Sequence, residues 1–268
     1  MPNAPTSFTP EIKTPALSSR GAEIIELVAR AGGSMRIQSI AEALEVSEET
    51  IRRNVRRLSD EGLVQKVHGG VLLQHGSTEL SFTQRMAENP APKQRIAAHV
   101  AALIGNGSSL FLDIGSTTAF IAKALMGHQE LLVVTNSVAV AHSLAARNNN
   151  RVFMPGGELR SHDGGIFGAQ VLEFVGQFRT DFAVLSAAAI NAQTGFMLFD
   201  MDEAVYSRAI MENSKTRILA ADSSKFGRAA PIAIGAPSAV DLLITNAPPP
   251  EDIQSAARIW GTEIVVAG

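Results

Sequence analysis

Four arginines and one asparagine lie close together near the N-terminus, and these side chains are suited to binding nucleic acid. They are Arg52, Arg53, Asn54, Arg56 and Arg57. Arginine can donate two hydrogen bonds to guanine and asparagine can pair with adenine, while arginine also binds backbone phosphates. The same residues could instead form the solvated basic face of an ordinary helix. The elements that carry them distinguish the two interpretations.

The residues around this cluster predict three short helices followed by a β-hairpin. Apolar stripes at 24–28 and 37–44 indicate two helices, and Ser47 is a suitable N-cap for a third. The third helix turns one apolar face inward and the arginines outward; that face is Ile51, Val55 and Leu58. Residues 63–73 alternate apolar and polar side chains around two glycines, which is typical of a hairpin.

Together these elements predict a winged helix-turn-helix domain over residues 20–73 that binds double-stranded DNA. The net charge of −3 and the isoelectric point near 6.1 argue against a nonspecific nucleic-acid binder. Residues 51–75 nevertheless hold five basic and two acidic side chains, a local balance of +3, which favours specific reading by one basic helix. We expect DNA contacts from Ser47, Glu48, Thr50, Arg52, Arg53, Asn54, Arg56, Arg57, Lys66 and His68.

A second group of polar residues, which includes three consecutive hydroxyl side chains, follows an apolar run in the C-terminal part of the chain. The group is Asp113, Gly115, Ser116, Thr117 and Thr118, and a helical stretch comes after it. Backbone amides at a helix start, together with hydroxyl groups, can hold a phosphate without a cation. Ordinary N-capping of the helix is the alternative interpretation.

The elements around this loop predict an α/β domain over residues 93–268. Apolar strand-like runs alternate with helical stretches, which indicates a mainly parallel sheet with helices on both faces. The runs are 110–113, 131–135, 152–154, 182–186, 218–221, 242–245 and 264–266. Ligands in such sheets bind beyond the carboxyl ends of the strands. We therefore expect a pocket there, formed with the polar turns Thr135, Asn136, Ser137, Gly156, Gly157 and Glu158.

Four charged residues further along the chain are candidates for the same pocket. They are Asp200, Glu203, Asp222 and Lys225. These side chains could bind sugar hydroxyls or phosphate, or a carboxylate could move protons in an isomerase. The structural alternatives are helix capping by Asp200 and Asp222 and a surface ion pair of Glu203.

The composition excludes several classes of site. The chain has no cysteine, which excludes disulfides and thiolate-bound metals and suits a cytoplasmic protein. Its six histidines lack metal-ligand spacing and no cofactor motif is found, so we expect neither metal nor cofactor. No apolar run approaches the roughly 18 residues that span a membrane. Residues 1–19 predict a disordered tail, and residues 74–92 predict a polar linker with room for one short helix.

These motifs resemble those of the DeoR family of bacterial regulators. Residues 44–53 (LEVSEETIRR) and the later HGG at 68–70 are similar to its winged helix-turn-helix signature. The segments DIGSTT, VTN, GGELR and DSSKFGR are similar to its sensor domain, whose fold is shared with ribose-5-phosphate isomerase and CoA transferases. The resemblance adds Arg160 and Asn191 to the expected effector site.

Within the family, the chain resembles the glycerol-3-phosphate subgroup and also regulators of agrocinopine catabolism. Supporting segments are SHDGGIFG, QFRTDF, RAIMENS and APPP. The resemblance implies a repressor, not an enzyme, that a phosphorylated sugar or polyol releases from its operator DNA. Closed symmetry is usual for such proteins, so we expect a homodimer or homotetramer on a paired operator.

The chain departs from the family pattern at three places, which leaves the effector's identity open. Asn54 replaces an aspartate, and Ser207 replaces a common lysine. Ser186 and Ala189 replace glycines and Asn191 an aspartate in a G-x-x-G-I-D segment. Two alternatives are a sugar-phosphate isomerase with an accessory DNA-binding domain and a transcriptional activator. Loss of ionisable groups at 191 and 207 argues against the isomerase.

Overall fold

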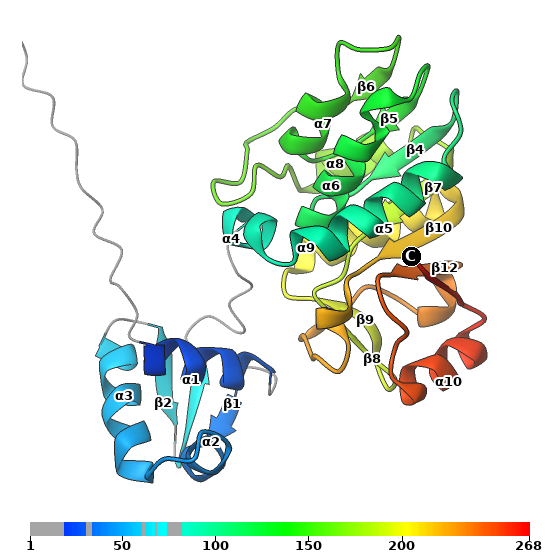
Figure 1. Cartoon of the computed structure of the whole chain (residues 1–268). Helices are drawn as coiled ribbons and strands as arrows, with labels where there is room; N and C mark the ends of the chain where they lie inside the picture. Colours follow the sequence, from blue (N-terminus) through cyan, green and yellow to red (C-terminus); the bar gives the residue numbers. More distant parts are fainter. Residues whose placement is uncertain (1–18, 31–33, 61–62, 68, 74–81) are drawn as a thin grey trace, which may run out of the picture. The chain divides into compact units, whose positions relative to one another are not determined.

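The computed structural model describes residues 19–30, 34–60, 63–67, 69–73 and 82–268. The chain divides into two compact units, residues 1–75 and 76–268, and each is described by itself (Figure 1). Apart from Ser19, the predicted tail lies outside the described residues. No helix within the described ranges is long and apolar enough to cross a membrane.

Three helices and a small sheet form the N-terminal unit. The helices are α1 (Ser19–Arg30), α2 (Ile37–Ala43) and α3 (Glu48–Asp60), and the strands are β1 (Ser34–Arg36), β2 (Val64–Val67) and β3 (Gly70–Leu73). The strands are antiparallel in the order β1-β3-β2. Ile24, Ile40, Ile51 and Leu58 are fully buried between the helices. The sequence predicts these helices and the hairpin but not β1, whose three residues are too few to show an alternating pattern.

A seven-stranded parallel sheet forms the centre of the C-terminal unit, in the order β13-β12-β10-β7-β4-β5-β6. The strands are β4 (Ser109–Leu112), β5 (Leu132–Val134), β6 (Arg151–Phe153), β7 (Thr180–Leu185), β10 (Ser214–Ala220), β12 (Leu242–Thr245) and β13 (Glu263–Val266). The seven predicted runs all correspond to these strands. Parallel strands are covered on both faces, so their sequences are apolar throughout and easy to recognise.

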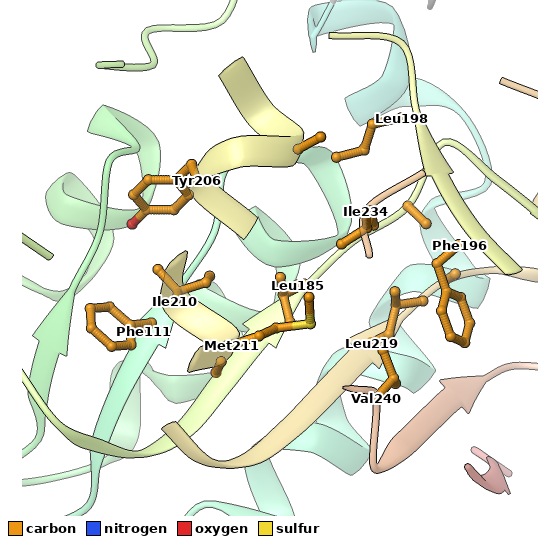
Figure 2. Close-up of a cluster of buried hydrophobic side chains, with 14 of the residues drawn as sticks. Phe111, Leu185, Phe196, Leu198, Tyr206, Ile210, Met211, Leu219, Ile234 and Val240 are labelled. Atoms are coloured by element: carbon orange, nitrogen blue, oxygen red, sulfur yellow. The ribbon is translucent and has the colours of Figure 1, made fainter. Parts of the chain in front are cut away.

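Helices cover both faces of this sheet, as the alternating pattern predicts. On one face lie α5 (Pro90–Leu103), α6 (Ser116–Ala124) and α7 (Val138–Leu144), whose buried side chains share one core with the strands. On the other face lie α8 (Ala169–Val175) and α9 (Met201–Glu212). In that second core, Tyr206 and Ile210 of α9 lie beside Phe111 of β4 (Figure 2).

A second, three-stranded antiparallel sheet extends the core on the α9 face. Its strands are β8 (Ala189–Asn191), β9 (Gly195–Leu198) and β11 (Ile232–Ala233), in the order β11-β9-β8. Phe196 and Leu198 of β9 belong to the core shown in Figure 2, and the Phe196 ring is 5.5 Å from that of Trp260 in α10 (Glu251–Trp260). The 3-10 turns are η1 (Leu125–Gly127), η2 (Ser223–Lys225) and η3 (Pro237–Ala239). The sequence analysis predicts neither this sheet nor α8 and α10.

The segment 74–92, predicted as a linker, holds α4 (Phe82–Ala87) and the first turn of α5. Pro90 stands at the start of α5, where its missing amide hydrogen is not needed for the helix. Helix α5 begins at Pro90, before residue 93, where the predicted α/β domain starts. Both helices belong to the C-terminal unit.

Replacing Gly70 with alanine should destabilise the N-terminal unit. A Cβ at this position would lie 2.8 Å from the backbone oxygen of Met35, so β1 and β3 would have to separate. We expect a loss of about 1–3 kcal/mol in the free energy of unfolding of this unit. Denaturant unfolding of the full chain measures it, with Gly127→Ala as control because nothing lies within 4 Å of a Cβ there. Equal stability of the two variants would contradict the close approach of β1.

Candidate functional site

Helix α3 presents the basic residues as the sequence predicts. Ser47 caps it, since the Thr50 amide donates to Ser47 Oγ at 3.3 Å. Its apolar side is buried, with Ile51, Val55 and Leu58 at most 2% exposed. Burial of one side leaves the other to solvent, and the four arginines lie there, exposed. The arrangement has the form of a helix that can enter the major groove of DNA.

The predicted DNA-binding residues differ in how free their side chains are. Arg52 donates to Glu48 at 2.8 Å, a surface ion pair that occupies both residues. Asn54 is half-buried, and its Nδ2 donates to the Thr50 carbonyl at 2.8 Å, so the amide expected to read adenine is engaged within the helix. Within the described residues, Arg53 and Arg56 have neither a hydrogen bond nor an ion pair.

Two of the predicted DNA-binding residues belong to the wing. Lys66 is exposed on β2. His68, also predicted to contact DNA, lies outside the described residues.

The predicted ligand loop lies at the carboxyl end of β4, in the centre of the parallel sheet. Asp113 is 2% exposed, and the Ile114 amide donates to its Oδ1 at 2.7 Å. Gly115 is the residue directly before α6. Any larger residue is disfavoured there, because a Cβ would clash with Ser186 Oγ. The predicted polar loop thus fits tightly between two neighbouring strand ends.

Ser116, Thr117 and Thr118 form the first turn of α6 and are all buried. Their amides have no carbonyl four residues earlier within the helix to bind. The Thr118 hydroxyl donates to the Gly115 carbonyl at 3.0 Å, so it serves the loop. Among the described residues no partner is found for the hydroxyls of Ser116 and Thr117.

Arg160 lies within a cluster of carboxylates drawn from two segments of the chain. Its Nε donates to Asp163 at 3.0 Å, its Nη1 lies 3.2 Å from Asp200, and its Nη2 donates to both Asp163 and Glu203. Its guanidinium carbon is 4.2 Å from the centre of the Phe167 ring. Burial alone would lower the pKa of Arg160, but the bonds to Asp163 and Glu203 raise it overall. The side chain predicted to bind an effector is thus held by protein carboxylates.

Asp200 and Asp222 both act as helix caps, which is the structural alternative to a role in ligand binding. Asp200 accepts from the Glu203 amide at 3.0 Å and so caps α9, while it also faces Arg160. Glu203 is 7% exposed, so its ion pair with Arg160 is buried. The structural alternative, a surface ion pair of Glu203, is therefore wrong. Asp222 accepts from the Ser224 amide at 3.0 Å and begins η2, which contains the buried Lys225.

Asp113 is a buried carboxyl group near this cluster. Burial and the negative charge of Glu203 raise the pKa of Asp113 to about 8, although hydrogen bonds from the Ile114 amide and Ser207 oppose the shift. Ser207 Oγ donates to Asp113 Oδ2 at 3.2 Å. Burial, followed by the charge of Asp113, raises the pKa of Tyr206 well above its ordinary value. Asp113 is therefore mostly protonated at neutral pH, and in that form it can donate a hydrogen bond.

Most of the remaining predicted residues serve local turns. Thr135 Oγ1 accepts from the Ser137 amide at 3.1 Å, and Ser137 caps α7. Asn136 Nδ2 donates to the Ile166 carbonyl at 3.4 Å, and its buried Oδ1 has no partner in the described part of the chain. Asn191 Oδ1 accepts from the amides of residues 193 and 194 in the β8–β9 turn, so it is a turn residue in this structure. Gly156, Gly157 and Glu158 are exposed.

Sequence analysis missed several residues that belong to the cluster or lie beside it. Asp163 and Phe167 belong to the segment SHDGGIFG, which supports the family resemblance but was not assigned to the site, and Tyr206 belongs to no predicted motif. Their contacts with Arg160 and Asp113 identify them. A cavity of about 170 Å³ shares two of them; its lining is Phe167, Gly168, Ala169, Val171, Leu172, Asp202, Val205 and Tyr206. This cavity adjoins the carboxylate cluster and does not include the first turn of α6. No group of three His, Asp or Glu side chains within the described ranges could hold a metal ion.

Comparison with known families assigns both units. Residues 20–76 match the DeoR-like helix-turn-helix domain, and residues 88–247 match the DeoR C terminal sensor domain. The chain belongs to the DeoR family. It is 42% identical over 230 residues to the glycerol-3-phosphate regulon repressor of Escherichia coli (strain K12), covering 86% of this chain and 91% of that protein. It is 36% identical over 244 residues to the transcriptional repressor CsqR of the same strain, covering 91% and 93%.

Among solved structures, the chain is similar to ribose 5-phosphate isomerase A from Neisseria gonorrhoeae. The TM-score is 0.37 at 18% identity, with 50% of this chain and 52% of that chain covered. It is also similar to eIF2B beta from Chaetomium thermophilum, with a TM-score of 0.45 at 17% identity, covering 64% and 53%.

Arg53→Ala should weaken binding to a specific operator by about 1–3 kcal/mol if this free arginine contacts a base edge. Arg52→Ala is the matched control, because Arg52 is exposed on the same helix but is paired with Glu48. We expect the control to have the smaller effect. Gel-shift titration of both variants at one salt concentration measures the difference. Equal affinity of native protein and Arg53→Ala would exclude Arg53 from base recognition.

Asp113→Asn should change how stability depends on pH. The folded pKa of Asp113 is about 8, above the ordinary value of 3.8, so folding favours the protonated carboxyl group. The stability from this group is complete below the ordinary pKa and is lost as pH rises through about 8. The native protein should therefore lose stability relative to Asp113→Asn between pH 5 and pH 8.5, by denaturant unfolding of the full chain. Glu212→Gln, an exposed carboxylate on α9, is the control; a native curve parallel to that of Asp113→Asn would contradict the protonated state.

Proposed function

We propose that the chain is a transcriptional repressor that binds operator DNA through α3 and is released by a phosphorylated sugar or polyol. The observation that carries this proposal is the pairing of two features in one chain. One is a capped helix with two uncommitted arginines, and the other is an anion-suited helix start at the carboxyl edge of a parallel sheet.

The geometry of α3 supports the DNA-binding half. Arg53 and Arg56 lie opposite the buried Ile51, Val55 and Leu58, and within the described residues no protein group competes for them. Both relatives named above are called transcriptional repressors, and they match nearly the whole chain. A repressor on a two-fold operator would protect half-sites about one helical turn of DNA apart, or a multiple of that distance. We propose a homodimer or homotetramer for this reason.

The first turn of α6 supports the phosphate part of the effector half. Three amides without acceptors inside the helix, the positive end of its dipole and two hydroxyls without partners in the described chain all favour an anion there. Arg160 has its donors committed to carboxylates, so we assign it to the support of the site and not to the phosphate. Lys225 is the cation that we propose on the far side of the ligand.

The carboxylate cluster supports the sugar or polyol part. Among the described residues, three carboxylates face Arg160: Asp163, Asp200 and Glu203. This wall therefore suits the hydroxyl groups of a ligand better than its phosphate. The Asn136 Oδ1 atom is a further acceptor with no partner in the described chain. The relative that is 42% identical to this chain is named for glycerol-3-phosphate, a phosphorylated polyol. This compound is therefore the first effector to test.

Asp113 and its partner argue against sugar-phosphate isomerisation as the function. The side chain that donates to Asp113 is the Ser207 hydroxyl, which does not ionise near neutral pH. The raised pKa of Asp113, about 8, leaves only a minor fraction of this carboxyl group ionised and available as a base at that pH. Turnover of ribose-5-phosphate by the purified chain would contradict this assignment.

Calorimetric titration with glycerol-3-phosphate, a sugar phosphate and their unphosphorylated parents tests the effector half. The phosphorylated compounds should bind and should raise the midpoint of thermal unfolding, and their parents should not. Thr117→Val should abolish this binding but leave operator binding intact, because Thr117 lies in the C-terminal unit. Thr194→Val, in the exposed β8–β9 turn, is the matched control. Equal affinity for a phosphorylated compound and its parent would rule out the phosphate loop.

A further inference from the structure

Lys93 is a buried lysine that neither the sequence motifs nor the proposed ligand site account for. It lies in the first turns of α5 and is 1% exposed. Its Nζ donates to the carbonyl of Arg85 at 2.5 Å and to that of Glu88 at 2.8 Å. Both carbonyls lie at the end of α4, where a helix has no amides left to satisfy them. Lys93 therefore fixes the corner at which α4 turns into α5.

The corner between α4 and α5 is also attached to the loop that carries Lys225. Asn89, the residue of the turn, has a left-handed backbone conformation with φ of 49°. Its Nδ2 donates to Asp222 Oδ1 at 3.4 Å, and the same oxygen accepts from the Ser224 amide at 3.0 Å. Asp222 Oδ1 thus joins the corner to the start of η2.

The pKa of Lys93 depends on burial and on two charged neighbours at this junction, Asp222 and Lys225. Burial lowers the pKa of Lys93, the attraction of Asp222 opposes this, and the repulsion of Lys225 adds to it. Lys93 is therefore sensitive to the charges of both Asp222 and Lys225. An anion that arrives beside Lys225 would change this balance, because buried charges interact strongly at short range.

Helix α4 has the position needed to pass such a change along the chain. It is the first described element of the C-terminal unit, directly after residues 74–81. It packs against α6, whose first turn is the proposed phosphate loop, and Figure 1 shows it leading into α5. The one short helix thus contacts α6 and, through its corner, the Asp222 loop.

We propose that the corner of Asn89 and Lys93 couples the ligand site to DNA binding, with Lys93 as a positioning residue that holds α4 in place. This inference rests on the proposed function and deepens it by naming the connection between its two halves. Coupling is reciprocal, so operator DNA must change the affinity for the ligand by the same factor as the ligand changes the affinity for DNA. We expect this effect of DNA to reach the Asp222 loop.

Hydrogen exchange of the full chain with and without operator duplex tests this coupling without any knowledge of the effector. In the native protein, saturating operator should change the exchange rates of residues 82–93 and 222–227 by about fivefold or more. Asn89→Gly should remove the change at 222–227, because it deletes the bond to Asp222 while glycine keeps the left-handed backbone without strain. Lys93→Met should do the same by releasing the end of α4.

Asn149→Gly is the matched control, since Asn149 is an exposed asparagine with φ of 57° and should behave as the native protein does. If Lys93→Met fails to fold in a thermal unfolding measurement, the Asn89→Gly comparison still decides the matter. Unchanged exchange at 222–227 in the native complex, or an equal change in Asn89→Gly, would overturn the coupling. A chain that selects no duplex at all would instead remove the proposed function, so the two failures are distinguished.

Discussion

Buried charge at the carboxyl edge of the seven-stranded sheet is the constraint on which the rest of the C-terminal unit depends. The Arg160 guanidinium is only partly hydrated, and its pairing with Asp163 and Glu203 offsets the cost of removing these charges from water. Those pairings tie the loop after β6 to the first turn of α9. In the described part of the chain no cation is hydrogen-bonded to Asp113, which is mostly protonated at neutral pH instead and accepts a hydrogen bond from Ser207. The edge therefore has a charged wall on one side and a neutral, donor-rich loop on the other.

That division determines which chemistry each part of the edge can perform. A wall with more carboxylates than cations accepts hydrogen bonds from a ligand and disfavours its phosphate. The first turn of α6 has the opposite preference, since amides and a helix dipole favour an anion. One ligand with a phosphate at one end and hydroxyl groups at the other satisfies both.

The sequence predicted the repetitive parts of the fold and the polar ends of its strands, but not which side chains pair. Continuous apolar runs identify parallel strands, whereas β8, β9 and β11 are short and packed on a larger sheet, so their own pattern is weak. The Arg160–Glu203 pair joins residues 43 positions apart, a distance at which no local pattern operates. Asn54 and Asn191 were predicted as binding residues, yet each satisfies a nearby backbone group, which only the three-dimensional structure reveals.

The most direct test of this account is an NMR titration of the full chain with glycerol-3-phosphate, following the backbone amides. If the phosphate binds at the start of α6, the largest shifts should be those of Ser116, Thr117 and Thr118. Smaller shifts should reach Asp113 and Glu203. Shifts confined to the cavity beside α8, at residues 167–172, would place the ligand elsewhere and contradict the assignment of the phosphate to α6.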